Sequence, residues 1–168
     1  MGDAAESGRL VLQLYELRTE PTLRRARAWF AFEFHPASAR DVLAAWLGPG
    51  PASAPYRMVT TYWEMAAALV LHGGLRPELF HAANTEHVSV YAKLRPYLAE
   101  VRGASGDTGY LASLEQVVLG MPDAEARIAV IERYLARQAR YTAEGRQAQP
   151  GDAPSPERAE QAASRPAV

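Results

Sequence analysis

The sequence predicts an all-α protein, an antiparallel bundle of about seven helices around one buried central helix. Three observations support this fold class. Apolar residues recur with the 3.6-residue period of a helix through most of the first 143 residues. No stretch keeps the two-residue alternation of a strand. Connections between the predicted helices are short, which favours antiparallel neighbours. In a chain of 168 residues, 48% apolar residues are enough to fill a core.

The first two helices are predicted over residues 7–18 and about 21–35. In the first, apolar side chains fall on one stripe and charged ones lie elsewhere. The second begins with Pro21 in the first turn, where the missing N–H of proline costs nothing. Pro36 should end it, because the residue before a proline avoids helical geometry.

A short third helix is predicted over residues 39–47. Ser38 and Asp41 precede and open it in the pattern of a capping box, with Asp in place of the usual Glu. The following segment, residues 48–55, reads GPGPASAP and is a loop by composition.

The central helix is predicted over residues 55–72. Between Arg57 and Arg76, only Glu64 and His72 can ionise near neutral pH, and apolar residues occupy both sides of the helix. A membrane span is not expected, because it needs roughly 20 apolar residues and rarely tolerates a carboxylate at its middle.

Four helices are predicted after the central one. A short helix is predicted over residues 76–83 and a longer one over 86–102, in which Pro96 predicts a kink or a break. The next helix starts at residue 107 or 108 and runs to 120. The last is expected over residues 122–143.

Composition sets the domain organisation and excludes several classes of function. Residues 1–144 should form one domain and residues 145–168 a disordered tail, because the tail has no large apolar residue before Val168. A formal charge of −1 gives no general attraction to nucleic acid. The absence of cysteine fits a cytoplasmic protein, and the N-terminus shows no secretory signal.

Glu64 is the most informative single residue of the sequence. A carboxylate on a helix that is apolar on all sides should be protonated or paired, because burying it alone costs several kcal/mol. We expect Arg102 as its partner, with Arg27 second. One interpretation, which we favour, is a buried ion pair that fixes the register of the helices. The other is a polar anchor at the floor of a binding pocket. That pocket would be lined by Trp63, Tyr91 and Tyr110.

Metal and catalytic motifs are incomplete. Glu78 and His81 form a single E-x-x-H, whereas a di-iron carboxylate bundle needs two copies and two further glutamates. A mononuclear site could in principle draw on His72, His81, His87 and Glu64, but their spacing matches no ligand pattern. Serine-nucleophile and phosphate-loop motifs are missing. We therefore expect no cofactor and favour a protein that is not an enzyme.

The segments YWEMAAALVLHGGL, YAKLRPYLAEVR and GYLASLE resemble a family of uncharacterised bacterial all-helical domains of unknown function. The resemblance covers about residues 10–120. Its members tend to carry an aromatic-Glu helix that ends in Gly, a later helix that ends in Arg, and then an aromatic residue. Those positions are Glu64, Gly74, Arg102 and Tyr110 here. The resemblance implies a helical fold and a bacterial origin, and it implies no activity.

Our first functional hypothesis is a non-catalytic interaction or scaffolding module, acting as a homo-oligomer or on a protein partner through an apolar helix face. The alternative is a small-molecule sensor with a pocket near Glu64. A metal- or carboxylate-dependent enzyme is the third and least favoured. No membrane span and no nucleic-acid partner are expected.

Overall fold

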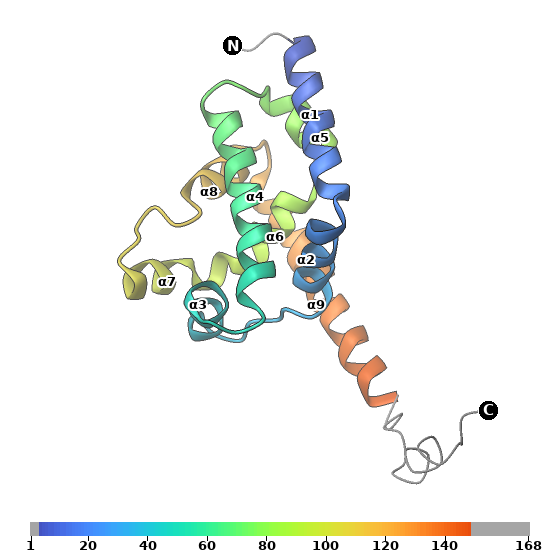
Figure 1. Ribbon diagram of the computed structural model, residues 1–168, viewed down its shortest axis with the longest axis vertical. Coiled ribbons are helices and arrows are strands. Elements are labelled where there is room, and N and C mark those ends of the chain that lie inside the picture. The colour runs from blue at the N-terminus through green and yellow to red at the C-terminus, as the bar shows by residue number, and fades with distance from the viewer. Residues whose placement is uncertain (1–3, 149–168) are drawn as a thin grey trace, which may run out of the picture.

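The computed structural model describes residues 4–148, with side chains as far as Tyr141, and it confirms the all-helical class (Figure 1). Every regular element in this range is a helix. The helices pack as a bundle around α4 (Ser53–Leu71), which contacts α2, α3, α6 and α8. Trp63 and Val59 of α4 are fully buried, so the predicted central helix is the core of the molecule.

The first two helices are α1 (Ala4–Thr19) and α2 (Pro21–Phe32). The side chain of Glu20 caps α2 by accepting the backbone N–H groups of Thr22 and Leu23. The helix ends three residues before the predicted boundary at residue 35. The backbone N–H groups of the two residues after it both donate to the Trp29 carbonyl, which turns the chain and brings Phe34 into the core.

Helix α3 (Ala39–Leu47) has the predicted boundaries and the predicted capping box. The Ser38 hydroxyl accepts the N–H of Asp41, and the Asp41 carboxylate accepts the N–H of Ser38 in return. The helix packs against α4 and α7.

Proline divides the next part of the chain, as predicted. Helix α5 (Pro77–Ala83) is followed by α6 (Glu86–Leu94), a 3-10 turn (Arg95–Tyr97) that contains Pro96, and α7 (Leu98–Ser105). The helix expected over 86–102 is therefore two helices, because proline has no N–H to continue the hydrogen-bond ladder.

The last two helices are α8 (Ala112–Leu119) and α9 (Ala124–Ala148). Helix α8 begins later than predicted, because Leu111 adopts a left-handed conformation with φ of 54° that a helix cannot include. Helix α9 lies against α6 and α2, and its end projects from the body (Figure 1). It runs four residues beyond the predicted domain boundary at 144. The rest of the expected disordered tail, residues 149–168, lies outside the described residues.

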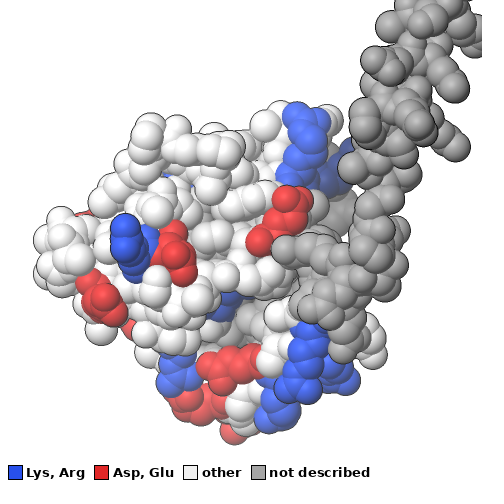
Figure 2. All heavy atoms as spheres, turned by 90° about the horizontal axis from the view of Figure 1, so that it is seen from below, with Lys and Arg blue, Asp and Glu red and all other residues white. Residues whose placement is uncertain are grey.

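The surface carries charges of both signs. On the face shown in Figure 2, basic and acidic side chains lie next to one another and leave wide uncharged areas. Among the described helices, none has the length and apolarity needed to cross a bilayer.

Candidate binding site

Glu64 lies against the start of another helix. Its two carboxylate oxygens accept the backbone N–H groups of Ser113 and Leu114, each at 2.9 Å. These donors belong to the first turn of α8, whose own preceding residue, Leu111, supplies no side-chain cap. The carboxylate thus satisfies two of the N–H groups that every helix leaves free at its N-terminus, and it meets the positive end of the helix dipole.

The expected pairing of Glu64 with a guanidinium is wrong. Arg102 donates from Nη1 to Glu115 at 2.8 Å and from Nε to the Tyr110 carbonyl at 2.9 Å. Arg27 bonds Glu86 instead. The partners of Glu64 are backbone N–H groups because its carboxylate lies directly at the N-terminus of α8. Hydrogen bonds from these N–H groups stabilise the charged carboxylate, as a guanidinium would.

The three aromatic residues expected to line a pocket near Glu64 are packed in the core. Trp63 is fully buried. Its ring makes an edge-on contact with Phe80 and a tilted contact with His87. Tyr110 stacks on Trp46 with ring centroids 3.9 Å apart and shares a 2.5 Å hydrogen bond with the Tyr56 hydroxyl. Tyr91 is also buried, and its hydroxyl donates to the Glu115 carboxylate at 3.3 Å. Neither cavity described below is lined by any of these three residues.

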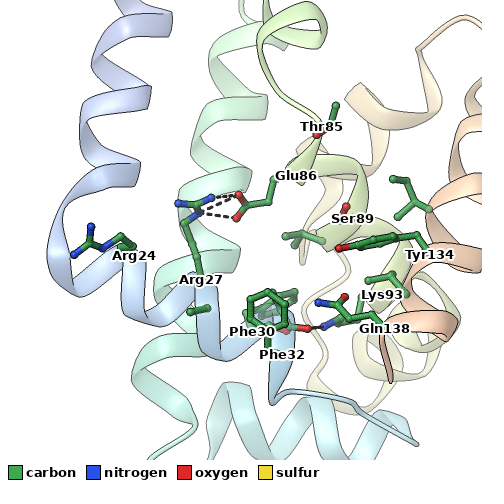
Figure 3. A pocket seen from close by; sticks show the side chains of 15 residues that line it. Arg24, Arg27, Phe30, Phe32, Thr85, Glu86, Ser89, Lys93, Tyr134 and Gln138 are labelled. Atoms are coloured by element: carbon green, nitrogen blue, oxygen red, sulfur yellow. Dashed lines mark hydrogen bonds and ion pairs between the residues drawn. The ribbon is translucent and has the colours of Figure 1, made fainter. Parts of the chain in front are cut away.

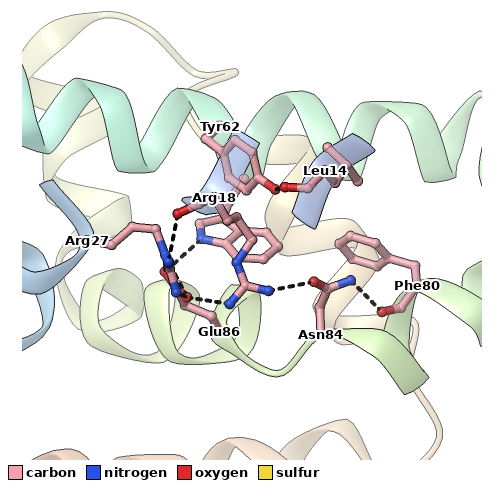
Figure 4. A network of polar contacts seen from close by, with 8 residues as sticks. Leu14, Arg18, Arg27, Tyr62, Phe80, Asn84 and Glu86 are labelled. Carbon is pink, nitrogen blue, oxygen red and sulfur yellow. Dashed lines mark hydrogen bonds and ion pairs between the residues drawn. The ribbon is translucent and has the colours of Figure 1, made fainter. Parts of the chain in front are cut away.

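A polar network has Glu86 at its centre (Figure 4). Arg27 bonds both carboxylate oxygens of Glu86, and Arg18 donates to one of them at 3.0 Å. The Trp63 indole N–H lies 3.4 Å from the other oxygen, and Arg18 also donates to the amide oxygen of Asn84 at 3.0 Å. The four polar residues come from α1, α2, α6 and the turn before α6, so the network ties the N-terminal helices to the rest of the bundle.

Charge in this network keeps Glu86 ionised. Burial raises the pKa of the Glu86 carboxyl, but the hydrogen bond and charge of Arg27 and the charge of Arg18 outweigh burial and leave that pKa below its ordinary value. The same contact with Glu86 raises the pKa of Arg27. The sequence gave little reason to single out Glu86. Acidic residues are common in the first turn of a helix, because they interact favourably with the helix dipole there.

The candidate metal ligands do not form one cluster among the described residues. His81 and His87 stack, with Nδ1 of His81 3.2 Å from Nε2 of His87. His87 is fully buried, and this desolvation lowers its pKa to about 3. His72 ends α4 and is exposed, and the Glu78 carboxylate lies on the surface near Arg76. Within residues 4–148, no three His, Asp or Glu side chains gather as a metal site would need.

A cavity of about 590 Å³ lies between α2, α6 and α9 (Figure 3). One part of its wall is polar and the other apolar. The polar part contains Arg24, Arg27, Thr85, Glu86 and Ser89. The apolar part contains Phe30, Phe32, Val90, Ile131, Tyr134 and Leu135. This cavity is not the one expected near Glu64, and the sequence did not indicate it because α2 and α9 are about a hundred residues apart.

Lys93 forms part of the cavity wall and closes the end of α2. Its ammonium donates to the carbonyls of Phe30 at 2.5 Å, Phe34 at 3.0 Å and Ala31 at 3.3 Å, and it lies 5.0 Å from the Phe30 ring centroid. These carbonyls are the free acceptors of a helix C-terminus. Burial lowers the pKa of Lys93 to about 8.

The cavity continues outward into a second hollow of about 510 Å³ on the projecting part of α9. Phe32, Tyr134 and Gln138 line both hollows, and Arg137 and Tyr141 line only the outer one. Phe32 is 53% exposed and Tyr141 70%. Large apolar side chains are thus presented to solvent around a concave surface.

The fold and this surface define an all-helical domain with an amphipathic cavity under its last helix. The chain matches the family described as a domain of unknown function (DUF4760) over residues 4–121, and it belongs to that family. The matched range contains the expected residues 10–120 and ends before α9. No curated protein and no solved structure matches the chain.

Proposed function

We propose that this protein is a non-catalytic interaction module that docks an acidic amphipathic helix of a partner protein. The docking surface is an apolar ridge formed by Phe32, Val130, Tyr134 and Tyr141. The observation that carries the proposal is the exposure of these four large apolar side chains, each 52% or more exposed, of which Phe32, Tyr134 and Tyr141 line the outer hollow. An amphipathic helix binds an apolar surface through anchors spaced one and two turns apart.

The spacing on α9 suits a helical partner. Val130, Tyr134 and Tyr141 are separated by four and seven residues, which places them on one stripe of the helix. The inner side of α9 is already used, because Ile128 is fully buried and Ile131 packs on the core. The stripe spans about 16 Å at a rise of 1.5 Å per residue, the length of three helical turns.

The charges around the ridge favour an acidic partner. Arg133, Arg137 and Arg140 are exposed and form no ion pair with the side chains that the structure describes. A second copy of this chain would bring the same arginines to the interface, where like charges repel. A partner with carboxylates beside its apolar stripe would complement them and gain specificity and association rate.

A second exposed apolar group lies on α1, and it provides a matched control. Leu12 and Tyr15 are as exposed as the ridge residues. However, neither lines either hollow, so the surface around them offers a partner no cavity described here. Scattered exposed apolar residues are normal and by themselves indicate no function.

The test uses two synthetic amphipathic helices with the same leucine stripe, one with glutamates and one with lysines on the remaining positions. Binding to the full chain is measured by fluorescence anisotropy. We expect the acidic peptide to bind about ten-fold tighter or more than the basic one, a difference of ~1.4 kcal/mol. The Val130→Ser/Tyr141→Ser variant should lose this binding, and the Leu12→Ser/Tyr15→Ser variant should keep it.

Three results would contradict the proposal. They are equal binding of the two peptides, equal loss in both variants, and a ridge that is covered by a second copy of the chain. Sedimentation velocity detects the last case as a dimer that the Val130→Ser/Tyr141→Ser variant dissociates.

We also propose a bacterial, cytoplasmic setting for this module. The absence of cysteine and the ratio of one lysine, Lys93, to 17 arginines support it. Fractionation of the native host, with the protein detected in the membrane or outside the cell, would contradict this part.

A further inference from the structure

We infer that the cavity between α2, α6 and α9 binds a single-chain amphiphile with an anionic head group, such as a long-chain carboxylate. This inference is independent of the docked helix proposed above. The cavity and the ridge share Phe32 and Tyr134, but Val130 and Tyr141 belong only to the ridge and Ser89 only to the cavity.

The size and the wall of the cavity suit such a ligand. Its volume of about 590 Å³ falls within the range of small-molecule sites, which are mostly apolar with a few polar groups placed at one point. Here Phe30, Ile131 and Leu135 provide the apolar wall for a chain. Figure 3 shows the Phe30 ring below the Arg27–Glu86 contact and the Tyr134 ring to its right, beside Ser89.

The polar part of the wall carries excess positive charge. Arg27 and Arg18 both bond the carboxylate of Glu86, so two guanidinium groups share one negative charge. Arg24 lies one turn before Arg27 on α2, is exposed, and has no ion-pair partner among the described residues. Arg18 does not line the cavity, so the lining groups Arg24, Arg27 and Glu86 have a net charge of plus one, which favours an anion over a cation.

Two hydroxyl groups at the same place are free to donate. Thr85 and Ser89 line the cavity next to Glu86, and neither side chain has a hydrogen-bond partner among the side chains and backbone described for residues 4–141. A carboxylate accepts several such bonds and gains more from each than a neutral group does. The two hydroxyls and Arg24 line the same cavity, so they offer an anionic head group hydrogen bonds and positive charge while its chain follows the apolar side chains.

Lys93 does not serve as the head-group cation. Its three N–H groups already have carbonyl partners at the end of α2. The negative charge of the ligand must therefore be bound by the other polar residues of the cavity. A mutational test of the head-group cation should accordingly target Arg24 and not Lys93.

Isothermal titration calorimetry of the full chain with dodecanoate and with dodecyltrimethylammonium, both below their micelle concentrations, tests the inference. The two probes have the same chain and opposite charge. We expect dodecanoate to bind about ten-fold tighter or more. Arg24→Gln should weaken dodecanoate about three- to ten-fold, because one exposed charge contact contributes up to ~1 kcal/mol, and should leave the cation unchanged.

Ser89→Phe should abolish binding of either probe by filling the cavity, with circular dichroism confirming that this variant folds. Val130→Ser/Tyr141→Ser should bind dodecanoate as the parent does. Absence of dodecanoate binding, equal affinity for the two probes, or no effect of Arg24→Gln would each overturn the inference. Failure of the peptide experiment described above would leave these results unaffected, so the two proposals fail separately.

Discussion

Glu64 acts as a helix cap that is supplied from a neighbouring helix. A usual cap comes from the residue just before the helix, but Leu111 occupies that position in α8 and has no oxygen in its side chain. The Glu64 carboxylate provides both missing acceptors from α4. This contact explains why a carboxylate is placed on an otherwise apolar helix without an arginine beside it.

Replacing this carboxylate should loosen the start of α8. We expect Glu64→Gln to lower the free energy of unfolding by about 1 kcal/mol, because the amide keeps one acceptor and loses the charge. Urea denaturation measures the change. The exposed Glu100→Gln, in the first turn of α7, is the matched control and should change stability by less than ~0.5 kcal/mol. Equal effects of the two substitutions would contradict the capping role.

His87 makes stability depend on pH. Its pKa is about 3 in the folded chain and near the ordinary 6.5 in the unfolded chain. Between these values the unfolded chain binds more protons, so stability is complete above pH 6.5 and is lost as the pH falls below it. His81 and Arg18, which carry or gain positive charge nearby, act in the same direction.

We expect His87 alone to cost about 2 kcal/mol of stability between pH 6.5 and roughly pH 5. His87→Phe should make the curve of unfolding free energy against pH shallower in this range, since Phe keeps the ring contact and cannot be protonated. A parent protein equally stable at both pH values would show that His87 is not held neutral.

The end of α7 depends on the backbone freedom of one glycine. Gly106 has φ of 76° and its N–H donates to the Arg102 carbonyl, the geometry of a left-handed helix C-cap. Gly103 lies inside the same helix without positive φ. A methyl group added at either position would meet no atom within 4 Å, so the two sites differ only in conformation.

Alanine substitutions at these two glycines should change stability in opposite directions. Gly106→Ala should destabilise the protein by about 1 kcal/mol, because alanine is strained at positive φ. Gly103→Ala should stabilise it by roughly 0.5–1 kcal/mol, because alanine is the better helix former. Thermal unfolding of both variants checks the prediction. The same sign for both would mean that α7 does not end where the structure places its cap.

Helix boundaries were predictable where local chemistry determined them. Ser38 with Asp41 marked the start of α3, and Pro96 marked the break after α6. The predicted boundaries were wrong where contacts with residues distant in the sequence determine the end of a helix. Helix α8 starts at Ala112, after the left-handed Leu111, and is capped by Glu64 from α4. The Phe30 carbonyl at the end of α2 is bonded by Lys93 from α6. No local pattern carries that information.

At the scale of the whole molecule, the sequence indicated the class of fold and the central helix but did not indicate the cavity between α2, α6 and α9. Burial was predictable from helical period for Trp63 on α4 and Tyr91 on α6, whereas Tyr110 lies in the turn before α8. The sequence could not show that Trp63 packs on Phe80 and His87, and Tyr110 on Trp46, instead of around a void. The cavity forms where α2, α6 and α9 meet, and Glu86 and Ser89 belong to it only through the tertiary packing of these helices.

Helix α9 contributes residues to both proposed binding surfaces. It covers the cavity with Ile131 and Leu135 on its inner side and presents Val130 and Tyr141 to solvent on its outer side. Since the family match ends at residue 121, the part of each surface that α9 contributes lies outside the matched range. The two proposed activities therefore both depend on α9, where they share Tyr134 and otherwise use different residues.

The most direct test of the central claim is a titration of the ¹⁵N-labelled full chain with the acidic amphipathic peptide, followed by amide chemical shifts. We expect the shifts to change at Phe32 and along residues 130–141 and to stay constant around Leu12 and Tyr15 on α1. Changes centred on α1, or no change at saturating peptide, would contradict the claim that the outer face of α9 is a docking surface.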